Sequence, residues 1–530
     1  MVSRNTIQSD ILKFYNVEKD IVLKMLEKNR SRIRITTDMW TSSTQKKQYM
    51  VITAHYLDDS WTLKNRIIRF VYVPSPHNAE SLTNILLECM MDWNIDRNLS
   101  TLTLDNATTN DAMVDKVKAR LQHPSSSLLL NGDLFHMRCA AHILNLIVKE
   151  GFKNIENGIE AIQTSVSFWT VTPKRKEKFE ETARQLNIGS GKSLELDLPT
   201  RWNSTYLMLE VALIYKTVFA RLKQREPQYK FLPSEHDWVM AKEMCERLSP
   251  FYKATLLFSG TNYPTSNLFF PEICEVKLGL RQWFLSDHEI IRNMAFDMME
   301  KFEKYWKVVH GIMVVAVILD PRFRMRLIFF YFPEIYGSDT ANEIEKVIIF
   351  LYELVEEYQS NTNSCASNQF GMSSSTSQTV ANNRPEDRLS KFDKWNQSYA
   401  NNTNASKNEL DFYLEEDILP RTQDFDIVSW WKTNGLKYPT LQKIARDILA
   451  IPMSSVASES AFSTSSRILS PYRSRLHPNT LEALICTQNW IKPKMQAVIL
   501  VEVGTPTFQI NNFDEENNDA PLVISMLDSL

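Results

Sequence analysis

The sequence predicts an α+β / α/β fold, with a mixed sheet near the N-terminus followed by a long and mostly helical stretch. Three observations support this prediction. Between positions 33 and 73, apolar residues recur in three short segments that are typical of consecutive strands. Helical and strand-like segments then alternate from 78 to 149, which is typical of parallel strands joined by helices. From 151 to 360 the spacing of apolar residues is mainly helical.

An N-terminal helical segment, residues 1–30, is expected before the sheet, with the helix itself over 7–30. The first part of the core, 31–150, begins with three strands. The expected elements are strands 33–38, 48–57 and 63–73, helix 78–93, strand 101–105, helix 110–121, strand 134–139 and helix 140–149. A three-stranded meander joined to parallel strands by crossover helices is the ribonuclease-H-like arrangement, and the rules for strand connections leave few alternatives.

Two aspartates follow from this order as candidate metal ligands. Asp38 and Asp105 are each expected to end a strand, and the first and fourth strands are neighbours in this topology. Neighbouring carboxylates repel each other unless a divalent cation lies between them, and Mg²⁺ prefers a few carboxylates with waters and phosphate oxygens. When each aspartate is considered alone, the simpler interpretation is a residue at a strand end or in a turn rather than a metal ligand.

Glu459 is the third candidate acid, in the stretch 451–469. Pro452 is typical of a helix start, and Ser454 or Ser455 is expected to accept hydrogen bonds from the first free N–H groups. A carboxylate among small and apolar residues is costly to bury unless a cation meets it. The alternative is an acid in the first turn that is favoured by the helix dipole.

The remaining chain divides by composition. Residues 151–360 are expected to form a helical insertion domain, and the Ser-, Asn- and Thr-rich stretch 361–408 a disordered linker. Apolar stripes return over 409–492, a region that must pack on the core, on another subunit, or on both. Residues 493–530 are expected to form an acidic tail.

Composition excludes several classes of protein. The formal net charge of −3 means that any nucleic-acid binding uses local basic surface. Six scattered cysteines without a CxxC pair argue against a disulfide framework and a zinc finger, so no zinc is expected. The N-terminus has no apolar signal core, and the longest apolar run is too short to span a bilayer, so no membrane association is expected.

Two further pairs of residues have more than one interpretation. Arg201-Trp202 is either a buried anchor beside a surface cation, or a tryptophan that stacks on a displaced base beside an arginine on phosphate. Cys139-x-x-His142 is a poor zinc site because two ligands are not four. His142 is either a satisfied helix histidine that supports an active site or a direct catalytic group.

Eight blocks in order carry a family resemblance. Together they resemble the hAT superfamily of transposases, and most closely its plant domesticated branch, the RICESLEEPER- and DAYSLEEPER-like proteins with a BED zinc finger. The likeness implies a ribonuclease-H-like domain that is interrupted by a large all-helical insertion and completed by a C-terminal hAT dimerisation region. The blocks are TTDMWTS, TLDNATTN, RCAAHILNL, LPTRWNST, LDFYLEE, DFDIVSWWK, YPTLQKIARDILAIP and SSVASESAFSTSSRILSPYRSRL.

The resemblance also implies roles for individual residues. Asp38, Asp105 and Glu459 match the family's metal-binding acids, which use Mg²⁺ or Mn²⁺ for two-metal phosphoryl transfer. The Cys-x-x-His motif falls on Cys139 and His142, as active-site support. The Arg-Trp motif falls on Arg201 and Trp202, as DNA contacts. The family's BED finger precedes the catalytic domain, and this chain is expected to begin after it.

Three functional hypotheses stay open at this point. The first is a nuclear, DNA-binding, dimerising protein that derives from a transposon and affects gene expression without cutting DNA. The second is a competent hAT transposase or a fragment of one. The third is an oligomerisation scaffold in which the acids are a relic. Because phosphate contacts alone give sequence-blind binding, the expected lack of a finger favours the first hypothesis over the second.

Overall fold

The protein is described by a computed structural model. The structure describes residues 3–122, 128–154, 156–189, 191–198, 201–370, 407–422, 424–470 and 473–503, without the side chains of 156–158, 307–310, 361–370 and 493–503. The chain divides into two compact units. The sheet unit comprises Met1–Cys139, Thr261–Tyr263 and Ser454–Leu530, and the helical unit comprises Ala140–Gly260 and Pro264–Met453.

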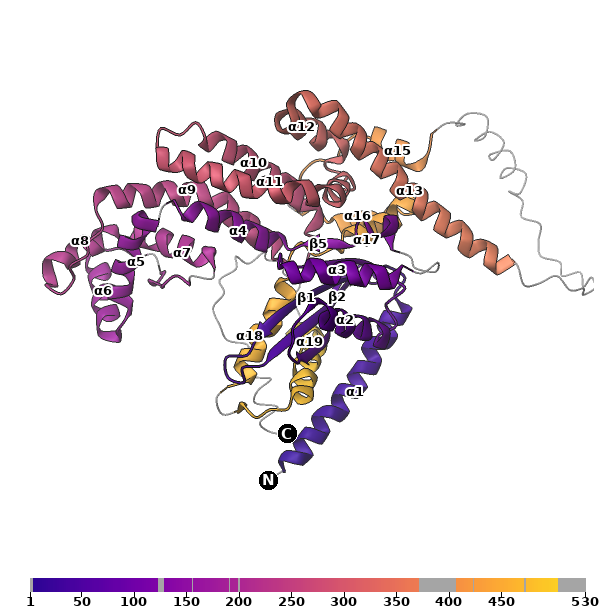
Figure 1. Ribbon diagram of the computed structural model, residues 1–530, viewed down its shortest axis with the longest axis horizontal. Coiled ribbons are helices and arrows are strands. Elements are labelled where there is room, and N and C mark those ends of the chain that lie inside the picture. The colour runs from indigo at the N-terminus through magenta and orange to yellow at the C-terminus, as the bar shows by residue number, and fades with distance from the viewer. Residues whose placement is uncertain are drawn as a thin grey trace, which may run out of the picture. The chain divides into compact units, whose positions relative to one another are not determined.

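The sheet unit contains a five-stranded sheet in the order β3-β2-β1-β4-β5 (Figure 1). Strands β1, β2 and β3 form an antiparallel meander, whereas β1 pairs with β4, and β4 with β5, in parallel. The predicted strand order, with the first and fourth strands side by side, is confirmed. The strands are β1 (Ile33–Thr41), β2 (Gln48–Leu57), β3 (Leu63–Val73), β4 (Leu99–Leu104) and β5 (His136–Arg138).

Helices cover both faces of this sheet. Thr36 on β1 contacts Ser458 of α18, while Met39, of opposite parity on the same strand, lines a pocket with residues of α2 and α3, so these helices lie on opposite faces. α19 packs on β3, and α1 packs on α19. The helices are α1 (Arg4–Lys28), α2 (Ala79–Asp92), α3 (Thr108–Leu121), α18 (Val456–Ile468) and α19 (Pro478–Val503), with the short helix η1 (Leu129–Gly132) before β5.

One hydrophobic core joins the two ends of the chain within the sheet unit. Phe462 of α18 stacks on Trp40 of β1 with ring centroids 5.9 Å apart, and the buried Trp490 of α19 stacks on Tyr15 of α1 at 5.4 Å. The indole N–H of Trp490 also donates to the carbonyl of Ile67, at 2.9 Å. The C-terminal part of the chain therefore completes the ribonuclease-H-like domain, as the sequence predicted.

The helical unit contains the insertion and part of the C-terminal region. α10 packs on α11, α11 on α4, and α7 on α9. Its elements are α4 (Ala140–Phe152), α5 (Glu156–Thr170), α6 (Pro173–Gln185), α7 (Trp202–Ile214), α8 (Lys216–Arg225), α9 (Glu235–Phe258), α10 (Ser266–Trp283), α11 (Glu289–Ile318), α12 (Arg324–Tyr336), η2 (Gly337–Asp339), α13 (Thr340–Phe370), α15 (Glu409–Glu415), α16 (Ile427–Thr433) and α17 (Pro439–Ile448).

The region 409–492, which the sequence presents as one segment, is shared between the units. α15, α16 and α17 belong to the helical unit, whereas α18 and α19 belong to the sheet unit. Most of the expected linker, at 371–406, and of the expected acidic tail, at 504–530, lies outside the described residues. Among the helices that are described, none has a stretch apolar and long enough to cross a bilayer.

Candidate metal and nucleic-acid site

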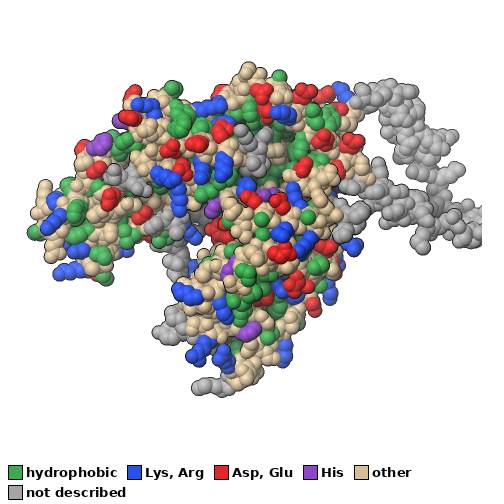
Figure 2. Space-filling view, in the orientation of Figure 1, with side chains coloured by type: hydrophobic (Ala, Val, Ile, Leu, Met, Phe, Trp, Pro, Cys, Tyr) green, Lys and Arg blue, Asp and Glu red, His purple; other side chains and the backbone are tan. Residues whose placement is uncertain are grey.

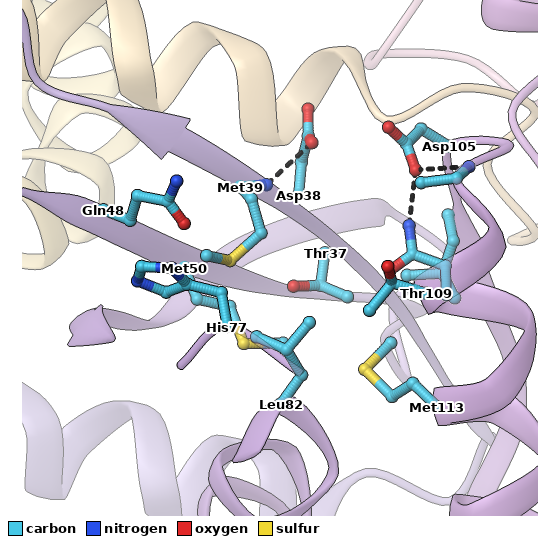
Figure 3. A pocket seen from close by; sticks show the side chains of 13 residues that line it. Thr37, Asp38, Met39, Gln48, Met50, His77, Leu82, Asp105, Thr109 and Met113 are labelled. Carbon is cyan, nitrogen blue, oxygen red and sulfur yellow. Dashed lines mark hydrogen bonds between the residues drawn. The ribbon is translucent and has the colours of Figure 1, made fainter. Parts of the chain in front are cut away.

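Asp38 and Asp105 are brought together by the register of the two central strands. Thr36 of β1 is aligned with Thr103 of β4 in a parallel pair. Two residues further along each strand are Asp38 and Asp105, and because side chains alternate with a period of two, both carboxylates lie on the same face. Figure 3 shows the two carboxylates on one side of the strand ends, with Met50 and Met113 on the other.

The prediction that Asp38 ends its strand is wrong. β1 continues to Thr41 through its pairing with β2, whereas β4 stops at Leu104, one residue before Asp105. Asp38 therefore lies where β1 runs past its parallel neighbour. The consequence for the site is the same, because the end of β4 leaves the side chain of Asp38 beside Asp105 at the edge of the sheet.

Glu459 approaches the same place from the opposite end of the sequence. It lies in the first turn of α18, where its backbone N–H bonds to the carbonyl of Ser455 at 3.1 Å, and its side chain is half-buried. Burial, together with the negative charges of Asp105 and Glu459, raises the pKa of Asp38 to about 7, although the hydrogen bond from Met39 N lowers it. Asp105 and Glu459 are thus each close enough to Asp38 to repel its ionised carboxylate.

Neutral donors orient the two aspartates. Asp38 Oδ1 accepts from the backbone N–H of Met39 at 2.7 Å. Asp105 Oδ1 accepts from the backbone N–H of Ala107 at 3.2 Å and from the side-chain amide of Asn110. Within the described residues, no lysine, arginine or histidine forms an ion pair with Asp38, Asp105 or Glu459. These contacts fix the carboxylates without neutralising them.

The residues fit a hydrated divalent cation better than a closed metal cage. No group of three or more His, Cys, Asp and Glu side chains in the described part of the chain is close enough to hold a metal ion unaided. Mg²⁺ keeps several waters and is commonly bound through one or two carboxylates plus substrate phosphates. Asp38 and Asp105, which repel each other on one face of the sheet, match that donor set.

A pocket lies beside the two aspartates, on the sheet face that α2 and α3 cover. Its floor contains the buried residues Met50, Leu82 and Met113, and the side chains of Gln48 and His77 are polar members of its wall (Figure 3). The sequence analysis did not select Gln48, His77 or the Asp105 partner Asn110. For Asn110 a signal was present, because this residue closes the block that carries Asp105.

Ser455 does not cap α18 as the sequence suggested. It occupies the N-cap position but its side chain makes no capping hydrogen bond. Its backbone N–H and its hydroxyl instead both lie 3.4 Å from the sulfur of Cys139, the residue that follows β5. Cys139 therefore contacts the start of the helix that carries Glu459. His142 lies in the first turn of α4 in the helical unit and is half-buried.

Arg201 and Trp202 lie in the helical unit at the start of α7. Trp202 is 3% exposed and its ring packs against Tyr206 and Tyr252, with centroids 6.2 and 6.5 Å away. Its indole is therefore not available to a base in this structure, which favours the buried-anchor interpretation. Arg201 is the N-cap residue, and its side chain is exposed.

Comparisons with protein families agree with this architecture. Residues 409–491 match the hAT family C-terminal dimerisation region, and residues 36–134 match the ZBED1 RNase-like domain. Residues 137–247 match the ZBED1 RNase-like helical domain. Residues 267–358 match the hAT-like transposase, RNase-H fold, although in this chain they are helices of the helical unit and the sheet lies at 33–138.

Curated relatives cover most of the chain. It is 38% identical over 92% of its length to "Putative AC transposase" of Zea mays, and spans 60% of that protein. It is 35% identical over 96% of its length to "Zinc finger BED domain-containing protein RICESLEEPER 2" of Oryza sativa subsp. japonica, and spans 72% of it. DAYSLEEPER of Arabidopsis thaliana is 34% identical, over 92% of this chain and 68% of its own.

This chain belongs to the hAT transposase family. Its similarity to the maize transposase and to the RICESLEEPER and DAYSLEEPER proteins confirms the resemblance seen in the sequence. The chain spans about 60% of the length of the two maize transposases that it matches. The dimerisation region is part of the described family architecture.

Proposed function

We propose that this member of the hAT family is a nuclear DNA-binding protein that acts as a homo-oligomer, a homodimer or a larger assembly, in gene regulation. The observation that carries the proposal is the closeness of Asp38 to both Asp105 and Glu459 at one edge of a ribonuclease-H-like sheet, where no cationic side chain of the described residues pairs with them. Carboxylates arranged in this way suit a phosphodiester backbone that arrives with divalent cations. The match to a dimerisation region supports the oligomer.

Local basic side chains supply candidate phosphate contacts. Lys174 and Lys176 near the start of α6, and Arg201 before α7, are exposed, and no ion pair or hydrogen bond of their side chains is found among the described residues. Figure 2 shows Lys and Arg side chains interspersed with acidic ones on the face in view, in keeping with the net charge of −3. Binding of DNA is therefore expected to use a few basic side chains rather than a broad basic surface.

Salt dependence of DNA binding tests this proposal. Fluorescence anisotropy with duplex DNA should give a log-log salt slope that falls by about one for each phosphate contact removed in Lys174→Ala, Lys176→Ala and Arg201→Ala. Lys242→Ala is the matched control, since Lys242 is 71% exposed on α9 of the same unit but is paired with Glu246. No retention of DNA at physiological salt by the unaltered protein would refute the proposal and favour a scaffold.

Strand cleavage is the second candidate function, and the raised pKa of Asp38 favours it. Groups with strongly perturbed pKa values concentrate at functional sites. Asp38 and Asp105 would hold the cation, Asn110, which donates to Asp105, would keep that carboxylate oriented, and Glu459 of α18 would close the site. A bound Mg²⁺ or Mn²⁺ would supply Lewis-acid stabilisation of the phosphoryl oxygens.

Cleavage is tested by nicking of supercoiled DNA in Mg²⁺ or Mn²⁺. Asp105→Asn should abolish nicking, because the amide cannot replace the charge of a ligand carboxylate. Asp115→Asn is the control, since Asp115 is exposed on α3 of the same unit. Equal nicking by the unaltered protein and by Asp105→Asn would dismiss the enzyme. Absence of nicking together with tight DNA binding would leave the regulatory role alone.

A further inference from the structure

A buried polar contact joins α18 to the centre of the sheet. Thr36 Oγ1 lies 3.1 Å from Ser458 Oγ and 3.0 Å from His55 Nε2. Thr36 and Ser458 have no exposed area and His55 is 5% exposed, so water does not compete for these bonds. The chain of hydrogen bonds therefore runs from β2 through β1 to α18 inside the core.

Each end of this contact stands next to an acid of the candidate site. Thr36 precedes Asp38 by two residues on β1 and so lies on the same face of the sheet. Ser458 immediately precedes Glu459 in the first turn of α18. The two hydroxyls therefore precede the carboxylates of Asp38 and Glu459 in the sequence, by two residues on β1 and by one residue on α18.

The apolar contacts of α18 do not determine its rotation by themselves. Phe462 stacks on Trp40 and meets Phe70 edge-on, at centroid distances of 5.9 and 6.3 Å, but burial of apolar surface has little directional preference. A shift of the helix by one residue turns it by about 100° and moves it by about 1.5 Å. Such a shift would separate the hydroxyl of Ser458 from that of Thr36, which would keep only His55 as a partner, and the loss of a buried hydrogen bond is unfavourable.

The environment of His55 keeps its hydrogen bond with Thr36 unchanged at physiological pH. Burial, with the nearby charge of Arg34, lowers the pKa of His55 to about 3, so the imidazole is neutral at physiological pH. A neutral imidazole Nε2 is a single donor or a single acceptor, and the Thr36 hydroxyl serves the complementary role. The hydrogen bond with His55 therefore holds the Thr36 hydroxyl in place while that hydroxyl also contacts Ser458.

We propose that Thr36, backed by His55, is a positioning residue that fixes the rotation of α18 through Ser458 and so aims Glu459 at Asp38. This inference rests on the proposed cation-binding role of the three acids. Thr36 itself touches neither cation nor DNA in this scheme. It acts only through the helix that carries Glu459.

The matched pair of variants is Thr36→Val and Thr53→Val. Thr53 lies directly across from Thr36 in the β1–β2 register and is 1% exposed, but its hydroxyl has no hydrogen-bond partner among the described residues. Both substitutions remove one buried hydroxyl and keep the shape of the side chain. They differ in that only Thr36→Val breaks the link to α18.

Binding of Mn²⁺ to the full chain, measured by calorimetry, is the first readout. Thr36→Val should weaken Mn²⁺ at least about tenfold, as is typical for groups that orient metal ligands, and Thr36→Ser should restore it. Thr53→Val should leave affinity unchanged. In a Glu459→Gln background Thr36→Val should cause no additional loss, because a group that acts through Glu459 has no effect once its charge is gone.

Hydrogen exchange of the α18 amides is the second readout, and it separates failure of this inference from failure of the proposed site. If the unaltered protein binds no Mn²⁺, the cation site is wrong, but α18 should still exchange faster in Thr36→Val than in Thr53→Val. Equal exchange in the two variants would overturn the positioning role. So would an additional loss of Mn²⁺ affinity from Thr36→Val in the Glu459→Gln background.

Discussion

In the helical unit, the fully buried Asp320 is bound by Arg322 and Asn267, at 2.6 and 2.9 Å. In the sheet unit Asp38 is instead repelled by two further acids, and no cationic side chain in the described part of the chain pairs with it. The first arrangement is how a buried charge is accommodated in a fold. The second raises the free energy of the folded state unless something positive arrives. The difference separates two kinds of acid in this chain, because Asp320 is neutralised by its neighbours whereas Asp38 is repelled by its own.

The same contrast is seen in pKa. Partial burial alone would raise the pKa of Glu416 in the helical unit, but hydrogen bonds from Lys437 and Arg324 outweigh burial and lower it to about 2. Burial raises the pKa of Asp38 in the sheet unit to about 7, with Asp105 and Glu459 adding to the rise. Protonation is therefore expected to weaken one unit and to strengthen the other.

The largest expected effect is on the paired acid. Asp320→Ala should destabilise the protein by about 3–5 kcal/mol, because it leaves Arg322 and Asn267 without their buried partner. Urea denaturation followed by circular dichroism measures this change. Arg326→Ala is the control, since Arg326 forms an exposed ion pair with Asp417 and its loss should cost below about 1 kcal/mol. A similar small loss for Asp320→Ala would contradict the contrast between units.

The pH dependence of stability should show the opposite behaviour of Asp38. Its folded pKa of about 7 lies above its ordinary value of 3.8, so the folded protein binds this proton more tightly and loses stability as pH rises between the two values. The loss is at most about 4 kcal/mol. Denaturation at pH 4 to 7 with a chelator should show this slope in the unaltered protein and not in Asp38→Asn.

Two further measurements sharpen the test of Asp38. Millimolar Mg²⁺ should reduce the slope between pH 4 and 7, because a cation stabilises the ionised carboxylates. Glu416→Gln should remove a slope of the opposite sign, since a lowered pKa stabilises the fold above pH 4.5 and is lost as pH falls towards 2. If Asp38→Asn keeps the full slope from pH 4 to 7, Asp38 is not the source of the slope and its pKa is not raised in the folded protein.

A smaller effect is expected from the surface of the helical unit. Leu436, between α16 and α17, is fully exposed and lies in the region that matches the hAT dimerisation family. Leu436→Asp should weaken self-association about tenfold in analytical ultracentrifugation, as loss of one well-buried interface side chain commonly does. Val17→Asp is the counterpart in the sheet unit, where Val17 is 57% exposed on α1. Dissociation by Val17→Asp alone would place the interface in the other unit.

Much of the sheet unit could be predicted because its elements have distinct periods. The expected strand 48–57 and strand 63–73 agree with β2 and β3, and helix 110–121 differs from α3 by two residues at its start. The ends of the strands were harder to predict, because a strand ends where its pairing with the neighbouring strand ends. β1 runs to Thr41 only since β2 pairs with it to Gln48, and this moved Asp38 from the end of the strand to its interior.

The candidate site could be predicted only in part. The three acids could be predicted as candidates because strand order and the family blocks point to them. The hydrogen bonds that join Thr36 to Ser458 and His55 could not be predicted, because these residues are separated by up to 422 positions and have no common spacing. Trp202 shows the same limit, since an Arg-Trp pair is compatible with either a buried or an exposed ring until its neighbours Tyr206 and Tyr252 are known.

The closure of the sheet by α18 and α19 has a consequence for biosynthesis. When Cys139 leaves the ribosome all five strands exist, but the face that Phe462 and Trp490 will cover stays bare until the last of these has been translated. At about 5–20 residues per second that interval lasts roughly 20–70 s. Nascent chains are therefore expected to expose this apolar face to water for that time, and a premature stop before α18 would yield a product that lacks both the helices that cover the face and Glu459.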